Sequence, residues 1–281
     1  MDKSADNSNS TIQSVKNPKT SEKTLSERIN FYVINLDRAV DRMERIEKDF
    51  ASFPIPFIRV LAVDGKTLTI PIDGYDAMVY SLNVGREASP GEIGCYLSHL
   101  KVLKMFLESD KEFALICEDD AMPTPDSYAV LKQAIAHAET WDLLRLYTSR
   151  RDRSFPYRSL PLPHNATVQY SLYTQLGCMF PAAAYVVNRQ AAGILVRKLV
   201  PMPDPYDLAL FQGRVGVREA NVFPNCFLLS EHCGNSTISN RTRRKDKLWH
   251  VVYWTRRVYR LRVQIVRYSL QIFRMIRRRL G

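Results

Sequence analysis

The chain has 281 residues and a formal net charge of +11, and its 46% hydrophobic and 10% aromatic residues are typical of a folded protein. This composition excludes a wholly disordered chain. The charge is uneven, because residues 240–281 contain 14 Lys and Arg and one acid, a net +13, which leaves 11 − 13 = −2 for the rest. The body therefore lacks the basic surface of a nucleic-acid-binding protein, and we expect no nucleic-acid partner.

The N-terminal residues and the cysteines indicate the compartment. Residues 1–28 are rich in Ser, Thr, Asn and Lys and have no apolar core, so we expect a disordered tail and no secretory signal. The five cysteines form no Cys-x-x-Cys pair, which disfavours a disulfide framework or a zinc site and favours a reducing cytosol. No segment approaches the roughly 18 uncharged apolar residues of a membrane span.

The first half of the chain alternates between strand and helix patterns. Strands are predicted at residues 29–36 and 57–63, with a helix at 37–50 between them. This order and spacing are typical of the start of a parallel sheet, so the fold class predicted is α/β. A further helix is predicted from Ser89-Pro90, because Pro is favoured in a first helical turn.

The second half continues with predicted strands at 113–117 and 141–147 and helices at 128–139 and 189–199. Residues 150–165 contain three prolines and four arginines. We expect them to form a mobile surface loop, of the kind that often serves as a lid.

Three consecutive acids, Glu118, Asp119 and Asp120, directly follow the apolar strand 113–117. They fit the carboxyl end of a buried strand, where open α/β sheets bind ligands. Their repulsion falls if a hard divalent cation lies among them, and such a cation can also hold the phosphates of a substrate. The pattern favours a metal-dependent enzyme with a phosphorylated donor; the alternative is a solvated acidic turn.

Five blocks of sequence follow one another in an informative order. They are Tyr32-Val-Ile-Asn-Leu-Asp-Arg38 with Asp41-Arg42, Phe57-Ile-Arg-Val-Leu-Ala-Val-Asp-Gly65, Gly91-Glu-Ile-Gly-Cys-Tyr-Leu-Ser-His99, Glu118-Asp-Asp120 and Trp141-Asp-Leu-Leu-Arg-Leu146. With them, residues 29–239 closely resemble glycosyltransferase family 25, which includes bacterial lipopolysaccharide β-1,4-galactosyltransferases and collagen galactosyltransferases. One departure is Cys117, where the family commonly has Leu before the acids.

The resemblance implies a GT-A-like domain at residues 29–239, with a mixed, mainly parallel sheet flanked by helices. It also implies transfer of galactose or a related hexose from a UDP-sugar, with inversion, onto a lipopolysaccharide or lipooligosaccharide glycan. The expected cofactor is Mn²⁺ or Mg²⁺, which neutralises the leaving diphosphate. The alternatives are a non-catalytic protein that binds glycans or nucleotide sugars, and a metal-dependent phosphohydrolase or nucleotidyltransferase.

The resemblance also assigns roles to acids and to a histidine. Glu118 and Asp120 are the expected metal ligands, and Asp119 is expected to brace the loop or contact the donor ribose. His232 is the expected third ligand, although a lone His is as often structural or exposed. Donor binding is expected from Glu118 and Asp119 together with residues near the strand ends and the start of the helix after Ser89: Asn35, Arg38, Arg42, Asp64, Gly94, Ser98 and His99.

Several of these donor residues have a simpler alternative. Arg38 and Arg42 fit a solvated helix face, Asp64 fits an ordinary turn, and the segment of Gly94 and His99 fits a helix packed through small residues.

Inverting transfer needs a carboxylate that takes the proton of the acceptor hydroxyl. We assign this role to Asp207, which follows a proline-rich break and precedes a helix-like run. Glu219 and Asp142 are the rival candidates. The alternative for Asp207 is a helix cap.

Residues 240–281 are predicted to form a basic amphipathic helix. Its apolar residues recur in steps of three, four and seven, and arginines project from the opposite side. We expect it to lie on an anionic membrane, which would make the enzyme cytoplasmic and peripheral on a bacterial inner membrane, beside a lipid-linked acceptor. The alternatives are an apolar stripe packed on protein and an RNA-binding arm. The stripe is Trp254, Val258, Leu261, Ile265, Tyr268, Ile272 and Ile276.

Overall fold

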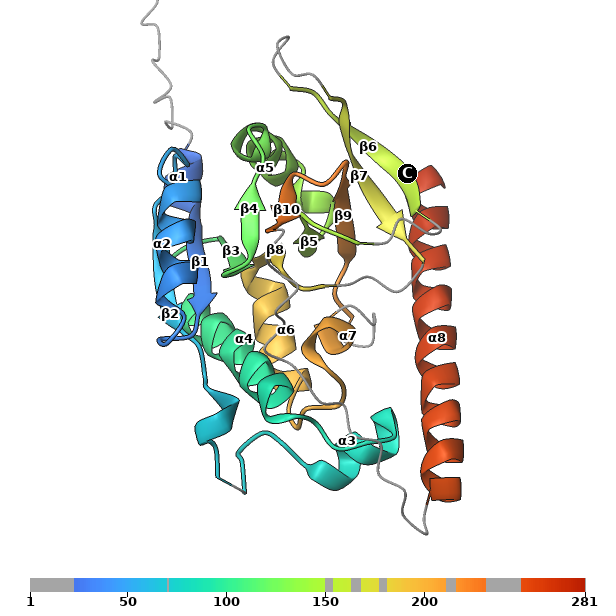
Figure 1. The fold of residues 1–281 in the computed structure, drawn as a ribbon. Helices are drawn as coiled ribbons and strands as arrows, with labels where there is room; N and C mark the ends of the chain where they lie inside the picture. The colour runs from blue at the N-terminus through green and yellow to red at the C-terminus, as the bar shows by residue number, and fades with distance from the viewer. Residues whose placement is uncertain are drawn as a thin grey trace, which may run out of the picture.

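A mixed sheet of eight strands forms the centre of the part of the chain that the structure describes (Figure 1). This computed structural model describes residues 23–69, 71–149, 154–162, 168–176, 181–210, 216–230 and 249–280. From one edge to the other the strands are β2 (Phe57–Leu61), β1 (Ile29–Asn35), β3 (Phe113–Glu118), β8 (Ala184–Asn188), β5 (Leu143–Arg145), β9 (Glu219–Phe223), β7 (Tyr170–Gln175) and β6 (Ser154–Leu160). The α/β fold class is therefore confirmed.

Strands β1, β2, β3, β5 and β9 run in the same direction, so their carboxyl ends lie along one edge of the sheet, at the ends of the strands. β1 pairs in parallel with β2 and β3, and β5 pairs in parallel with β9. β8 runs antiparallel between β3 and β5, so these two strands point the same way. Asn35 at the end of β1 and Glu118 at the end of β3 therefore lie at the same edge, which is where such sheets bind ligands.

One face of the sheet is covered by α2 (Val40–Asp49) and α5 (Ser127–Ala136) (Figure 1). Phe31 of β1 packs edge to face against Phe50 and Phe53, with ring centroids 4.9 and 5.6 Å apart. The short strand β4 (Ala121–Pro123), which contacts α2, pairs with β10 (Phe227–Leu229). The short α1 (Leu25–Arg28) leads into β1, and η2 (Ala138–Thr140) follows α5.

The opposite face carries the helices that build the site. They are α4 (Pro90–Glu108), α6 (Arg189–Lys198), α7 (Tyr206–Leu210) and, further out, α3 (Ala77–Val84). α4 begins with a capping box, in which the Glu92 backbone N–H donates to Ser89 Oγ and the Ser89 N–H donates to the Glu92 carboxylate at 2.9 Å. This cap explains why the predicted Ser89-Pro90 start is correct.

The start of α4 lies unusually close to the turn that follows β2, η1 (Gly65–Thr67). A Cβ at Gly94 would lie 2.5 Å from the Val63 carbonyl oxygen, and one at Gly65 would lie 1.6 Å from the Pro90 oxygen. Any side chain there would push α4 away from the sheet. The two glycines thus fix the position of the helix that carries Cys95 and His99.

Residues 154–160 correct one expectation, because they form strand β6 and not a surface loop. β6 pairs with β7 at the edge of the sheet, and the register shifts between Pro156 and Arg158. An edge strand tolerates Pro, since one side of its backbone needs no partner. Near the end of the domain, β9 and β10 are separated by a turn that begins at the Phe223–Pro224 cis peptide.

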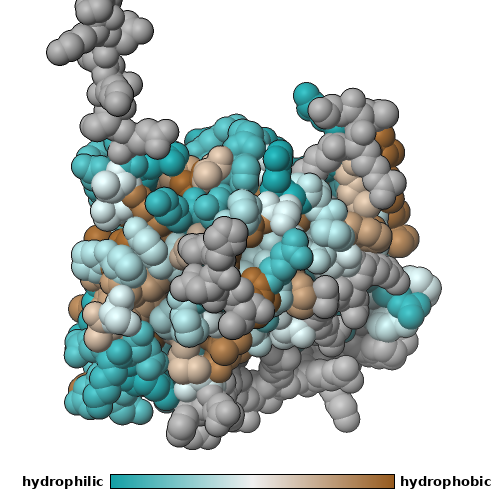
Figure 2. All heavy atoms as spheres, turned by 90° about the horizontal axis from the view of Figure 1, so that it is seen from above, coloured by the Kyte–Doolittle hydropathy of each residue, from teal (hydrophilic) through white to brown (hydrophobic). Residues whose placement is uncertain are grey.

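α8 (Trp249–Leu280) lies along the side of the body, against α3 and β7 (Figure 1). Thr255 Oγ1 donates to the Leu82 carbonyl at 3.2 Å, Tyr259 hydrogen-bonds Asp204, and the Arg267 guanidinium donates to the Leu176 carbonyl. Within the described residues, no helix has the length and apolar character needed to span a bilayer. Figure 2, a view from above, shows mainly hydrophilic residues on the side of α1 and α2, with small apolar patches between them.

Candidate active site

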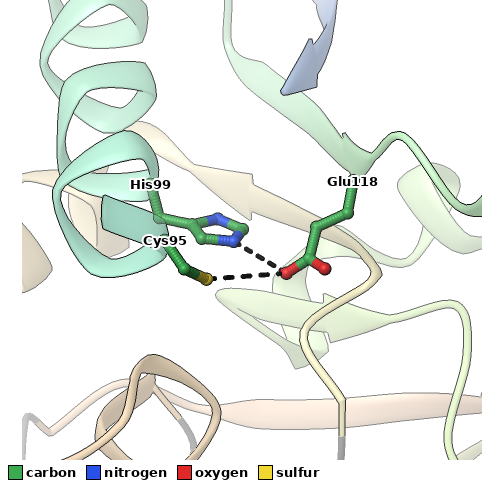
Figure 3. Close-up of side chains that lie close together, drawn as sticks. All are labelled: Cys95, His99 and Glu118. Atoms are coloured by element: carbon green, nitrogen blue, oxygen red, sulfur yellow. Dashed lines mark hydrogen bonds and ion pairs between the residues drawn. The ribbon is translucent and has the colours of Figure 1, made fainter. Parts of the chain in front are cut away.

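Cys95, His99 and Glu118 meet at the carboxyl end of β3 (Figure 3). Cys95 and His99 are four residues apart, so they lie on the same face of α4 and both point to the end of the strand. His99 Nε2 lies 3.1 Å from Glu118 Oε1, and Cys95 Sγ lies 3.9 Å from the same oxygen. Helix and strand thus contribute to one polar centre.

Two tyrosines extend this centre inward. The Tyr185 hydroxyl of β8 lies 3.1 Å from His99 Nδ1 and 2.8 Å from the Tyr206 hydroxyl of α7. The Tyr206 ring also stacks on the His99 ring, with centroids 4.0 Å apart and an angle of 8°. All three side chains are buried, so the orientation of the imidazole is fixed on both sides.

The surroundings change the protonation of His99 and Glu118. Burial lowers the pKa of His99 to about 3, although the charge of Asp207 opposes this effect, so the imidazole is neutral at neutral pH. Burial, together with the charges of Asp207 and Asp119, raises the pKa of Glu118 to about 8. A protonated Glu118 can donate to Nε2, which leaves Nδ1–H to donate to Tyr185.

Asp119 points to the other side, where Asn35 and Arg42 hold it. Asn35 Nδ2 donates to Oδ2 at 2.8 Å, and Arg42 forms an ion pair with Oδ1 at 2.9 Å. Asn35 Oδ1 in turn accepts from Arg59 at 2.7 Å. The structure therefore brings three residues of the sequence prediction together, and it adds Arg59.

The other predicted donor residues lie just beside this group. Arg38 forms an ion pair with Asp64, whose carboxylate also accepts from the Lys66 backbone N–H at 3.0 Å. Ser98 is fully buried; it accepts from the Val63 N–H at 2.8 Å and donates to the Gly94 carbonyl at 2.6 Å. Ser98 and Gly94 thus attach α4 to the turn that carries Asp64.

Among the candidate bases, Asp207 is the one beside Glu118. Its Oδ1 accepts from the Ala182 backbone N–H at 3.0 Å, and its charge acts on the pKa of both Glu118 and His99. Asp142, by contrast, precedes β5 at the opposite edge and pairs with Arg218 at 2.7 Å. Glu219 begins β9 and lies in register with Leu143, also away from the carboxyl ends.

Two sets of side chains could hold a cation. Burial raises the pKa of the Cys95 thiol, and the charges of Glu118, Asp207 and Asp120 raise it further, so Cys95 lies within electrostatic range of these three acids. Their carboxylates are the oxygen donors that Mn²⁺ and Mg²⁺ prefer. The Cys95, His99 and Glu118 donor atoms, all within 4.8 Å of one another, would suit a softer ion. The predicted ligand His232 lies outside the described residues.

Sequence reasoning missed Cys95, Arg59, Tyr185 and Tyr206. Cys95 could have been found, because it precedes His99 by one helical turn within a block already singled out. Arg59 neighbours the end of β1 once β2 is placed in parallel beside it. The tyrosines lie 86 and 107 residues after His99 in the chain, and no local pattern connects them to it.

Comparisons with known proteins identify the family of the chain. The model of glycosyltransferase family 25 (LPS biosynthesis protein) matches residues 28–210. Procollagen galactosyltransferase 1 of Danio rerio is 26% identical over 191 residues, which are 62% of this chain and 30% of that protein. A glycosyltransferase 25 family member of Drosophila melanogaster is 29% identical over 191 residues, 62% of this chain and 29% of that protein.

The chain spans about a third of the length of these relatives. Among solved structures, A197 from STIV has a TM-score of 0.41 and 12% identity, and the match covers 78% of this chain and 99% of that one. The family model matches well over half of the 281 residues, including both strands that end at the polar centre. The chain belongs to glycosyltransferase family 25.

Proposed function

We propose that the protein transfers a hexose, galactose or a close relative, from a UDP-sugar to a hydroxyl of a glycan, with inversion at the anomeric carbon. The observation that carries the proposal is the concentration of negative charge at the ligand-binding edge of the sheet. There the charges of Asp207 and Asp119 raise the pKa of Glu118, and those of Glu118, Asp207 and Asp120 raise the pKa of Cys95. The names of the procollagen galactosyltransferases support galactose as the sugar.

Glu118 and Asp120 would hold Mn²⁺ or Mg²⁺. The fit rests on the oxygen donors and on the negative charges of Asp207 and Asp119, which contribute to the raised pKa of Glu118 and would equally favour a bound cation. When bound, the ion supplies charge neutralisation for the departing diphosphate.

The chain's own residues would bind the donor and keep the site in place. Arg42 and Asn35 hold Asp119 at the edge where the nucleotide ribose would lie. Arg38, paired with Asp64 and 45% exposed along its side chain, is available to a phosphate or ribose. His99, Tyr185 and Tyr206 exclude water behind Glu118 and fix its carboxyl group.

Asp207 would take the proton of the acceptor hydroxyl. The acceptor oxygen then forms a bond to the anomeric carbon from the face opposite the diphosphate, the bond to the diphosphate oxygen breaks, and UDP leaves. The backbone N–H of Ala182 holds one carboxylate oxygen of Asp207, which leaves the other oxygen for the acceptor.

For the acceptor we propose a lipopolysaccharide or lipooligosaccharide glycan at the cytoplasmic side of a bacterial inner membrane. The description of the matched family, an LPS biosynthesis protein, supports this choice. Because several relatives are named procollagen galactosyltransferases, procollagen is the second acceptor to test in parallel.

The test incubates the full chain with Mn²⁺, UDP-galactose and a lipooligosaccharide acceptor, and measures UDP release and the glycan product. We expect Asp207→Asn to bind UDP normally and to lose transfer by ~10²- to 10⁴-fold, the usual contribution of a general base. Asp110→Asn, an exposed aspartate beyond α4, is the matched control and should retain activity.

Near-normal turnover by Asp207→Asn would remove this residue from the mechanism. Two other results would reject the proposed function itself. Release of phosphate or pyrophosphate without a glycan product indicates a hydrolase or nucleotidyltransferase. UDP-sugar binding without turnover on any acceptor indicates a binding protein.

A further inference from the structure

α8 packs on the body through a largely polar side. Among its described side chains the most buried are Val263, Arg267 and Gln271, each four residues after the last, with exposed fractions of 8%, 4% and 1%. A helix of a soluble protein normally turns its apolar stripe inward and its polar side to water. In α8 this arrangement is reversed.

The apolar stripe of α8 consequently faces away from the body. At 100° per residue, six large apolar side chains fall within about 60° of the helix circumference and extend over ~33 Å. Their exposed fractions lie between 47% and 63%. They are Trp254, Val258, Leu261, Ile265, Ile272 and Ile276.

Exposed arginines border this outward stripe on both sides. Arg257 and Arg262 lie about 40° beyond either edge of the stripe, and both are exposed. Further round, Arg260 and Arg277 are exposed as well. An apolar band between two rows of cations is the arrangement of a helix that lies in the headgroup zone of a bilayer.

The charge of α8 distinguishes a lipid partner from a second copy of the chain. Residues 249–280 contain nine arginines and no acid. Two such helices packed stripe to stripe would bring arginine rows together without any carboxylate on either helix, which is unfavourable. Phosphate headgroups supply the opposite charge.

We propose that the outward stripe of α8, with its bordering arginines, docks the folded enzyme on an anionic lipid bilayer. The helix remains attached to the body through hydrogen bonds of Thr255 to Leu82 in α3, of Tyr259 to Asp204, and of Arg267 to Leu176 just after β7. The body is then held at the membrane in one fixed orientation. This inference does not depend on the transferase reaction.

The test is flotation of the full chain with phosphatidylcholine vesicles, with and without phosphatidylglycerol. We expect binding to the anionic vesicles and a loss of at least ~10-fold in Val258→Ser/Leu261→Ser/Ile265→Ser, because three apolar side chains no longer enter the interface. Arg257→Gln/Arg262→Gln should reduce the preference for anionic vesicles. Gln264→Ser, exposed on the same turns but outside the stripe, should bind like the wild type.

Circular dichroism measures whether each variant is folded, and light scattering measures whether the protein is a monomer or a dimer. All variants should keep the wild-type helix content and melting temperature, since the replaced side chains are exposed. Flotation of the triple serine variant equal to wild type would overturn the proposal. So would a wild type that ignores vesicles and forms a dimer that the serine substitutions dissociate, because a second copy then covers the stripe.

Discussion

Glu118 and Asp142 are carboxylates at opposite edges of the same sheet, and their surroundings differ in one decisive respect. Burial raises the pKa of Asp142, but hydrogen bonds from Arg218 and Asn188 outweigh it and the net pKa is lowered. Glu118 lies near the negative charges of Asp207 and Asp119, and burial together with these charges raises its net pKa to about 8. A carboxylate with its own arginine stabilises the fold, whereas one crowded by other acids is placed for a positively charged ligand.

The largest expected effect is on catalysis at Glu118. Glu118→Gln should lower transfer by ~10²-fold or more, because an oxygen donor with a full charge is lost from the site. In buffer without divalent cations its free energy of unfolding should not fall, since an unfavourable buried acid has been removed. Activity assays with urea titrations check both parts; a clear loss of stability would mean that Glu118 is structural.

Asp142→Asn should give the opposite result. We expect it to lower the free energy of unfolding by about 2 kcal/mol, because Arg218 loses its charged partner but, being partly exposed, stays hydrated. Transfer per folded molecule should be unchanged. If Asp142→Asn loses activity while keeping its stability, Asp142 returns as a candidate base.

The ion pair of Asp142 with Arg218 should also make the free energy of unfolding depend on pH. A lowered pKa in the folded state means that ionised Asp142 stabilises the protein at every pH above its ordinary value of 3.8. That contribution disappears as the pH falls through the lower folded pKa. Urea titrations across this range should show a steeper acid loss in the wild type than in Asp142→Asn, and identical slopes would contradict the assignment.

The smallest expected effect is at Cys95. Its thiol lies 3.9 Å from Glu118, a weak contact, and burial raises its pKa so that it stays protonated. Cys95→Ser should change transfer by less than about threefold and leave the Mn²⁺ dependence as it is. A strong loss together with a change from Mn²⁺ to Zn²⁺ preference would favour the Cys95, His99 and Glu118 group as the metal site.

The sequence predicted what local patterns determine. The apolar runs of β1 and β3 and the Ser89-Pro90 start of α4 each have a short-range cause, and so does the position of Glu118 at a strand end. The missed features depend on distant partners. Residues 154–160 became a strand because β7 is available beside them, and the outward stripe of α8 depends on what Arg267 and Gln271 contact.

The most direct measurement is a crystal structure of the full chain with Mn²⁺ and UDP bound. The account predicts anomalous density for manganese between the Glu118 and Asp120 carboxylates, with the UDP diphosphate on the ion and the nucleoside toward Asp119. Manganese and UDP bound elsewhere, with Glu118 still hydrogen-bonded to His99, would contradict it.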